Sequence, residues 1–199
     1  AVINLTGESI AGKRWTAKQK ASILSSRINS TRAIVEAIGK AAKKPKALVN
    51  QSAVGYYGNV EYVEVTEDHP RGLDFLSDVA EKWEKEALKA EAFGIRVILP
   101  RTGIVLDKSA GALQKMLVPF KLYFGGPLGS GNQWFPWIHL EDEIGALIFS
   151  ADNQNLSGPV NLAAPDSVTM KQFCKALGKA MNRPSWAPVP GFVLKTGLG

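Results

Sequence analysis

The sequence predicts an α/β protein with a doubly wound parallel sheet, and three observations support this. Short apolar runs with the character of buried strands occur at residues 1–5, 47–50 and 95–99. Long segments with helical periodicity separate these runs, and such alternation is typical of α/β folds. The 199 residues, 45% of them hydrophobic, suffice for one packed domain.

The first strand–helix–strand unit occupies the first fifty residues. The strand at residues 1–5 runs into a turn, and Thr16 and Gln19 have the spacing of a helix capping box. Apolar positions then recur at steps of three and four, which predicts one long helix. These positions are Leu24, Ile28, Thr31, Val35 and Ile38. Gly39 and Pro45 bracket the exit of this helix.

The strand at 47–50 is followed by an acidic loop and a helix predicted at residues 74–93. The inner face of that helix comprises Leu76, Val79, Trp83, Ala87 and Ala90. Gly94 is expected to end it, and the strand at 95–99 follows. Two strand–helix–strand units in series favour a parallel sheet with right-handed connections.

Beyond Gly103 the sequence becomes rich in glycine and aromatic residues. Long irregular segments are usually functional, so residues 117–137 are predicted to form a lid or a substrate wall. A helix at 141–151, a strand at 160–162 and a helix opened by Thr169 and Gln172 complete the chain. We therefore predict a parallel-sheet part at 1–106, and a lid and substrate-binding region at 107–199 interleaved with the last sheet elements.

Composition narrows the functional classes. No apolar run reaches the ~20 residues of a membrane helix. The single cysteine, Cys174, suits a reducing compartment, and His69 and His139 lack metal-ligand spacing. The net charge of +6 is spread over lysines that alternate with glutamates. This pattern favours a solvated surface over nucleic-acid binding.

Residues 47–58 combine a buried strand with an unusual end. Ser52, Tyr56 and Tyr57 follow the strand among small residues, and open parallel sheets bind ligands at the carboxyl ends of their strands. These hydroxyls are therefore candidates for chemistry. The alternative is a strand end whose hydroxyls only cap a loop.

Seven segments in series resemble the extended short-chain dehydrogenase/reductases. More closely, they are similar to the nucleoside-diphosphate-sugar epimerase group described as cell-division-inhibitor-like, which has plastid members. The segments lie at 4–8, 26–27, 52–58, 101–106, 125–131, 137–142 and 161–165. They cover almost the whole chain in the family's order.

The resemblance implies a Rossmann-like sheet that carries NADP or NAD, with residues 1–106 as the C-terminal part of the dinucleotide-binding domain. By this analogy, Ser52 bonds a substrate oxygen, and Trp137 and His139 lie under the substrate region. The residues expected to contact the cofactor are Leu5, Thr6, Gly7, Glu8, Ser52, Ala53, Arg101, Thr102 and Gly103. For His139, a structural hydrogen bond is favoured over catalysis.

The chain departs from the superfamily at its acid–base pair. The superfamily uses a tyrosine with a lysine four residues later, but the helix at 74–93 contains no tyrosine. Lys82 is either the surviving lysine or a surface neighbour. Tyr56 is the best substitute for the acid–base group and Tyr57 the next, although a tyrosine is a poor base without a cationic neighbour. Ser52, Tyr56 and Lys82 are thus the predicted catalytic residues.

These features support two hypotheses about activity. The first is an NAD(P)-dependent oxidoreductase or sugar-nucleotide epimerase-like enzyme acting on a small molecule. The second is a non-catalytic, nucleotide-binding subunit of a larger protein assembly. The compartments left open are the bacterial cytoplasm and the interior of a plastid or mitochondrion.

The family's phosphate-binding glycine loop precedes the segment that matches Ala1. No Gly-x-Gly-x-x-Gly follows a strand within these 199 residues, so the resemblance implies an interior part of a longer protein. Because that loop and the next helix bind the pyrophosphate, we expect the 199 residues to bind NADPH weakly. Titration beside a protein extended at the amino end tests this. Equal, tight binding by both would place the complete cofactor site within these residues.

Overall fold

A computed structural model describes residues 1–60 and 63–189 of the chain. The chain divides into two compact units, which are described separately. The first comprises Ala1–Thr102 and Glu141–Leu162, and the second comprises Gly103–Leu140 and Ala163–Gly199.

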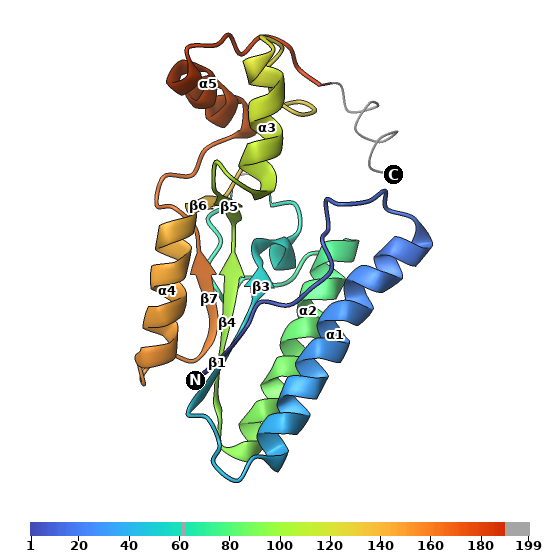
Figure 1. The fold of residues 1–199 in the computed structure, drawn as a ribbon, viewed down its shortest axis with the longest axis vertical. Coiled ribbons are helices and arrows are strands. Elements are labelled where there is room, and N and C mark those ends of the chain that lie inside the picture. The colour runs from blue at the N-terminus through green and yellow to red at the C-terminus, as the bar shows by residue number, and fades with distance from the viewer. Residues whose placement is uncertain (61–62, 190–199) are drawn as a thin grey trace. The chain divides into compact units, whose positions relative to one another are not determined.

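The first unit contains a wholly parallel sheet (Figure 1). Its strands are β1 (Val2–Asn4), β2 (Ala47–Asn50), β3 (Ser52–Ala53), β4 (Arg96–Thr102) and β7 (Gly158–Leu162). β4 pairs with both β2 and β3, which are separated only by Gln51, and with β7 on its other side. The α/β class and the parallel sheet predicted from the sequence are thus confirmed.

Helices cover both faces of this sheet, with α1 (Ala17–Lys40) and α2 (Phe75–Leu88) on one side and α4 (Leu140–Asp152) on the other (Figure 1). Thr16 caps α1 by accepting from the backbone N–H of Gln19. The Gln19 side chain does not complete the predicted capping box, because it donates to Glu8. The helix predicted at 74–93 narrows after Leu88 into a 3-10 turn, η2 (Lys89–Phe93).

Strand alternation divides the core of the first unit into two clusters. Leu48, Val97 and Leu99 pack towards α1 and α2 with Val35 and Ala87. The residues between them point the other way. That opposite cluster comprises Ala47, Val49, Ile98 and Leu147. Buried on both faces, the strands are nearly continuous apolar runs, as is typical of parallel sheets.

The second unit contains a two-stranded parallel sheet, β5 (Ile104–Leu106) and β6 (Trp137–His139), with helices α3 (Gly111–Lys121) and α5 (Met170–Met181). The predicted capping box at Thr169 is present in full at the start of α5. Between α3 and β6 the backbone forms only isolated bridges, at Gly125, Leu128 and Trp134. The expected lid segment is therefore not a continuous strand, and its function as a lid stays a prediction.

None of the helices in the described residues is both long enough and apolar enough to cross a bilayer.

Two glycines offer a matched test of packing. A Cβ at Gly126 would lie 2.3 Å from the Ala187 carbonyl oxygen, whereas a Cβ at Gly145, inside α4, would meet nothing within 4 Å. We expect Gly126→Ala to lower the free energy of unfolding by about 1–3 kcal/mol. Gly145→Ala should raise it by about 0.5–1 kcal/mol, because alanine favours helix. Chemical denaturation measures both, and a neutral Gly126→Ala would contradict the close backbone approach.

Candidate functional site

Buried polar side chains gather at the carboxyl ends of the strands in the first unit. Ser52, Arg101 and Asn161 lie side by side on three neighbouring strands, because Arg101 is in register with both of the others. Residues in register on parallel strands point to the same face of the sheet. The three side chains therefore converge at the edge where open α/β sheets bind ligands.

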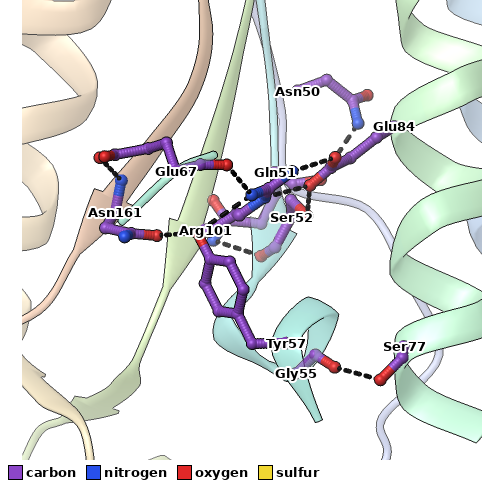
Figure 2. Close-up of polar contacts among 10 residues, drawn as sticks. All are labelled: Asn50, Gln51, Ser52, Gly55, Tyr57, Glu67, Ser77, Glu84, Arg101 and Asn161. Atoms are coloured by element: carbon purple, nitrogen blue, oxygen red, sulfur yellow. Dashed lines mark hydrogen bonds and ion pairs between the residues drawn. The ribbon is translucent and has the colours of Figure 1, made fainter. Parts of the chain in front are cut away.

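The centre of this group is an ion pair between Arg101 and Glu84 (Figure 2). Arg101 Nε donates to Glu84 Oε1 and Nη2 donates to Oε2, both at 2.9 Å. The side chains are 4% and 7% exposed. Burial opposes the charge on Arg101, but hydrogen bonds with Glu84 and Tyr57 outweigh it and raise the pKa of Arg101 above its ordinary value. The guanidinium is thus a permanent buried cation.

The same carboxylate determines what Ser52 can do. Ser52 Oγ lies 2.6 Å from Glu84 Oε1, and a carboxylate that is ion-paired to arginine only accepts hydrogen bonds. The Ser52 hydroxyl therefore donates its proton to Glu84. Towards any other group it can only accept, and the residue is 2% exposed.

Tyr57 links the guanidinium to the next strand. Arg101 Nη1 donates to Tyr57 Oη at 3.0 Å, and Tyr57 Oη donates to Asn161 Oδ1 at 2.6 Å. The backbone N–H of Asn161 donates to the Glu67 side chain. Arg101 Nη1 donates to the backbone carbonyl of Glu67. Burial raises the pKa of Tyr57, although the Arg101 hydrogen bond opposes it. Tyr57 is therefore a neutral structural link.

Tyr56 occupies a different environment. The Arg101 guanidinium lies 3.5 Å from the centre of the Tyr56 ring, which is a cation–π contact. Tyr56 also packs edge-on against Tyr57, with ring centres 5.4 Å apart. Among the described residues its hydroxyl has no hydrogen bond, and the residue is half-buried. Of the two tyrosines, Tyr56 is the one whose hydroxyl is not used by this network.

On the opposite face of β4, a second cluster joins three elements. Gln51 Nε2 donates to Thr102 Oγ1 at 2.5 Å, and Thr102 Oγ1 donates to Glu143 Oε1 at 2.9 Å. Glu143 lies in the first turn of α4 and is buried. This cluster contains no cation, in contrast to the Arg101 group.

The predicted cofactor loop follows β1 at the same edge of the sheet. Leu5 is 59% exposed, and Thr6 Oγ1 hydrogen-bonds Asn4 and Ser30. A Cβ at Gly7 would lie 3.0 Å from the guanidinium carbon of Arg27. Arg27 also donates to the Glu8 carbonyl. The loop is thus held against a cation.

The remaining predicted residues lie outside the hydrogen-bond network around Arg101. Lys82 Nζ bonds Asp78 at 2.7 Å, and its side chain is 49% exposed. It lies two residues before Glu84, so a helix turns it to nearly the opposite side. Ala53 follows Ser52 in β3. The second unit contains Gly103, Trp137 and His139, the latter two in β6.

Sequence reasoning missed the partners of the predicted residues. Glu84 had a usable signal: it lies four residues after Ala80 and three before Ala87, and so on a buried helical face. Gln51, Glu67, Glu143 and Asn161 carried no local signal, because their contacts span the sheet. Within the described part of the chain, no group of three or more His, Cys, Asp or Glu side chains could hold a metal ion.

Comparison with known proteins assigns the chain to a family. The NAD dependent epimerase/dehydratase family matches the chain over residues 1–163. The chain belongs to this family.

Curated relatives and a solved structure agree with this assignment. The chain is 47% identical over 198 residues to the epimerase family protein YfhF of Bacillus subtilis, covering 99% of the chain and 65% of that protein. It is 43% identical to the chloroplastic SDR39U1 homologue of Arabidopsis thaliana, covering 100% of the chain and 57% of the relative. The chain thus spans less than two thirds of the length of these relatives.

The crystal structure of human epimerase family protein SDR39U1 with NADPH superimposes with a TM-score of 0.93 at 36% identity. The match covers 99% of this chain and 68% of the human chain. The extended short-chain dehydrogenase resemblance inferred from seven sequence segments is confirmed, including the existence of a plastid member.

The Arg101–Glu84 pair predicts a large asymmetry between two glutamates of α2. Glu84→Gln leaves the buried guanidinium without a counter-charge, so we expect the free energy of unfolding to fall by about 3–5 kcal/mol. Glu81→Gln removes a carboxylate that pairs with Lys85 and Arg71 near the surface, and should cost about 1 kcal/mol or less. Urea denaturation at neutral pH compares them. Equal effects would show that the buried pair does not stabilise the fold.

Proposed function

We propose that this protein is an NAD(P)-dependent oxidoreductase or sugar-nucleotide epimerase-like enzyme in which Tyr56 is the acid–base residue. The observation that carries the proposal is the Arg101 guanidinium held 3.5 Å from the centre of the Tyr56 ring. This cation–π contact holds the Tyr56 ring at the carboxyl end of the sheet, and the Tyr56 hydroxyl is not used by the Arg101 network.

The residues at the sheet edge fit the cofactor. The loop after β1 leaves Leu5 exposed and sets Gly7 beside the Arg27 cation, and a cation near an open strand end suits an anionic dinucleotide. Leu5, Thr6 and Gly7 would hold it, with Ala53 at the end of the next strand. When bound, NAD(P) supplies the hydride acceptor or donor.

Within this proposal each side chain at the site has a different role. Tyr56 takes the proton of a substrate hydroxyl in the oxidative direction and returns it in the reductive direction. Ser52 can accept a hydrogen bond from a substrate donor but cannot donate to a substrate oxygen, because its proton is given to Glu84. Trp137 and His139 remain proposed substrate residues, and Lys82 contributes no group to the Arg101 network.

A second candidate is a nucleotide-binding subunit without catalysis. It is favoured by α2, which contains no tyrosine, and by the internal hydrogen bonds that occupy Ser52 and Tyr57. Mass spectrometry of small molecules that co-purify with the full-length protein separates the two candidates. A bound dinucleotide together with a sugar nucleotide supports the enzyme, whereas a bound dinucleotide alone supports the subunit.

The catalytic proposal predicts a specific kinetic defect. Tyr56→Phe should lower kcat about 10²–10⁴-fold, the usual contribution of a general acid–base group, and leave the Kd for NADPH unchanged. Steady-state turnover of the co-purifying substrate, with NADPH titration beside it, measures both.

Tyr57→Phe is the matched control. It removes the hydrogen bond to Asn161 and should cost about 1 kcal/mol of stability, while kcat stays within a few-fold of the unsubstituted protein. Unchanged turnover in Tyr56→Phe would move the acid–base role to another group.

A further inference from the structure

Arg27 is a partly buried cation of α1 whose hydrogen bonds include no carboxylate. Its Nη1 donates to the backbone carbonyls of Glu8 and Ile23, both at 3.0 Å. The Glu8 carboxylate favours the charge on Arg27 from a distance, but it is bonded to Lys13 and Gln19. Burial lowers the pKa of Arg27, because a cation removed from water without a bonded counter-charge costs free energy.

The orientation of the Arg27 guanidinium is fixed by its neighbours. Its central carbon lies 5.0 Å from the centre of the Trp83 ring, and Trp83 Nε1 donates to the buried Thr31. A Cβ at Gly7 would lie 3.0 Å from the same carbon and 3.2 Å from each terminal nitrogen. These nearly equal distances place Gly7 over the flat face of the guanidinium. Because glycine has no Cβ, the loop after β1 can approach this closely.

One edge of the Arg27 guanidinium is left open. Nε and Nη2 have no hydrogen-bond partner among the described residues, and neither nitrogen is fully buried. Their N–H groups point in parallel and match two oxygens of a carboxylate or a phosphate. In Arg101 the same Nε–Nη2 edge binds both oxygens of Glu84. Arg27 therefore presents, towards solvent, the edge that Arg101 uses to bind an anion.

We propose that the Nε–Nη2 edge of Arg27 binds a phosphate group of a nucleotide. This inference rests on the proposed function, in which the sheet edge holds a dinucleotide and a sugar nucleotide, both of which contain a diphosphate. Arg27 contacts the loop after β1 at Gly7 and Glu8, and open parallel sheets bind ligands at such strand ends. The backbone N–H of Gly7 also has no partner among the described residues, so it is a further donor in this loop.

Nucleotide titrations of the full-length protein test the proposal. Arg27→Gln removes the charge and should raise the Kd of the nucleotide whose phosphate it binds about 10–100-fold, the range for hydrogen bonds to a charged group. Arg27→Lys keeps the charge but loses the parallel N–H pair, so the rise should be smaller. The matched control is Arg32→Gln in the same helix. Arg32 pairs with Glu86, and its loss should leave every Kd unchanged.

Three ligands distinguish the sources of the phosphate. A rise in Kd for both NADPH and NADH assigns Arg27 to the diphosphate of the dinucleotide. A rise for NADPH alone assigns it to the 2′-phosphate, which NADH lacks. A rise for UDP-glucose alone assigns it to the diphosphate of a sugar nucleotide. Each of these results supports a phosphate site at Arg27.

The salt dependence of binding separates a phosphate contact from a purely structural role. Raising the salt from about 0.05 M to about 0.5 M should weaken binding to the unsubstituted protein more than binding to Arg27→Gln, because screening acts on the charge that the variant lacks. A residue that only supports the loop would leave this salt response unchanged. Circular dichroism of each variant checks that it is folded, and Arg27→Lys carries the test if Arg27→Gln does not fold.

Two results would overturn the proposal. Unchanged Kd values for all three nucleotides, in Arg27→Gln or in a folded Arg27→Lys that replaces it, would remove Arg27 from the site and leave the proposed function standing. Absence of nucleotide binding by the unsubstituted full-length protein would overturn both the phosphate site and the proposed function.

Discussion

The buried ion pair between Arg101 and Glu84 is the constraint on which the ligand-binding edge depends. A guanidinium with almost no exposure to water must have its charge balanced and its N–H groups bonded. Glu84 meets the first need from α2. Tyr57 and the Glu67 backbone meet the second. The helix, the loop and the sheet are therefore held by one side chain.

The Arg101–Glu84 ion pair affects the neighbouring hydroxyl groups in different ways. Ser52 gives its proton to the same carboxylate, and Tyr57 is enclosed between Arg101 and Asn161. Only the ring face of Tyr56 meets the guanidinium, so its hydroxyl is left out of the network. A single cation thus separates two adjacent tyrosines into a structural one and a candidate for chemistry.

Strand alternation explains why two unlike polar clusters lie so close together. Arg101 and Thr102 are consecutive in β4, and successive side chains point to opposite faces. The face towards α2 contains an ion pair. The face towards α4 contains neutral partners and a carboxyl, Glu143, without a cation. The backbone between them separates an ion pair from a cluster without a cation.

Much of the fold followed from local patterns. Sequence patterns predicted the apolar strands around Val49 and Ile98 and the helical period of α2 around Trp83. They did so because burial on a strand or a helix imposes a repeat on the sequence. The end of α2 at Leu88 was missed, since the tightening of a last helical turn depends on packing and carries no composition signal. The Gln19 bond to Glu8 was missed because capping spacing does not show which acceptor a side chain chooses.

The sequence by itself determined the parallel sheet, the strand ends that contain Ser52 and Arg101, and the family to which the chain belongs. Only the tertiary structure decided the partners of those residues. Glu84 comes from a helix 17 residues before Arg101, and Asn161 from a strand 60 residues after it. Such pairings arise from register between elements and from the need to bond every buried polar group. Neither condition leaves a pattern within a short stretch of sequence.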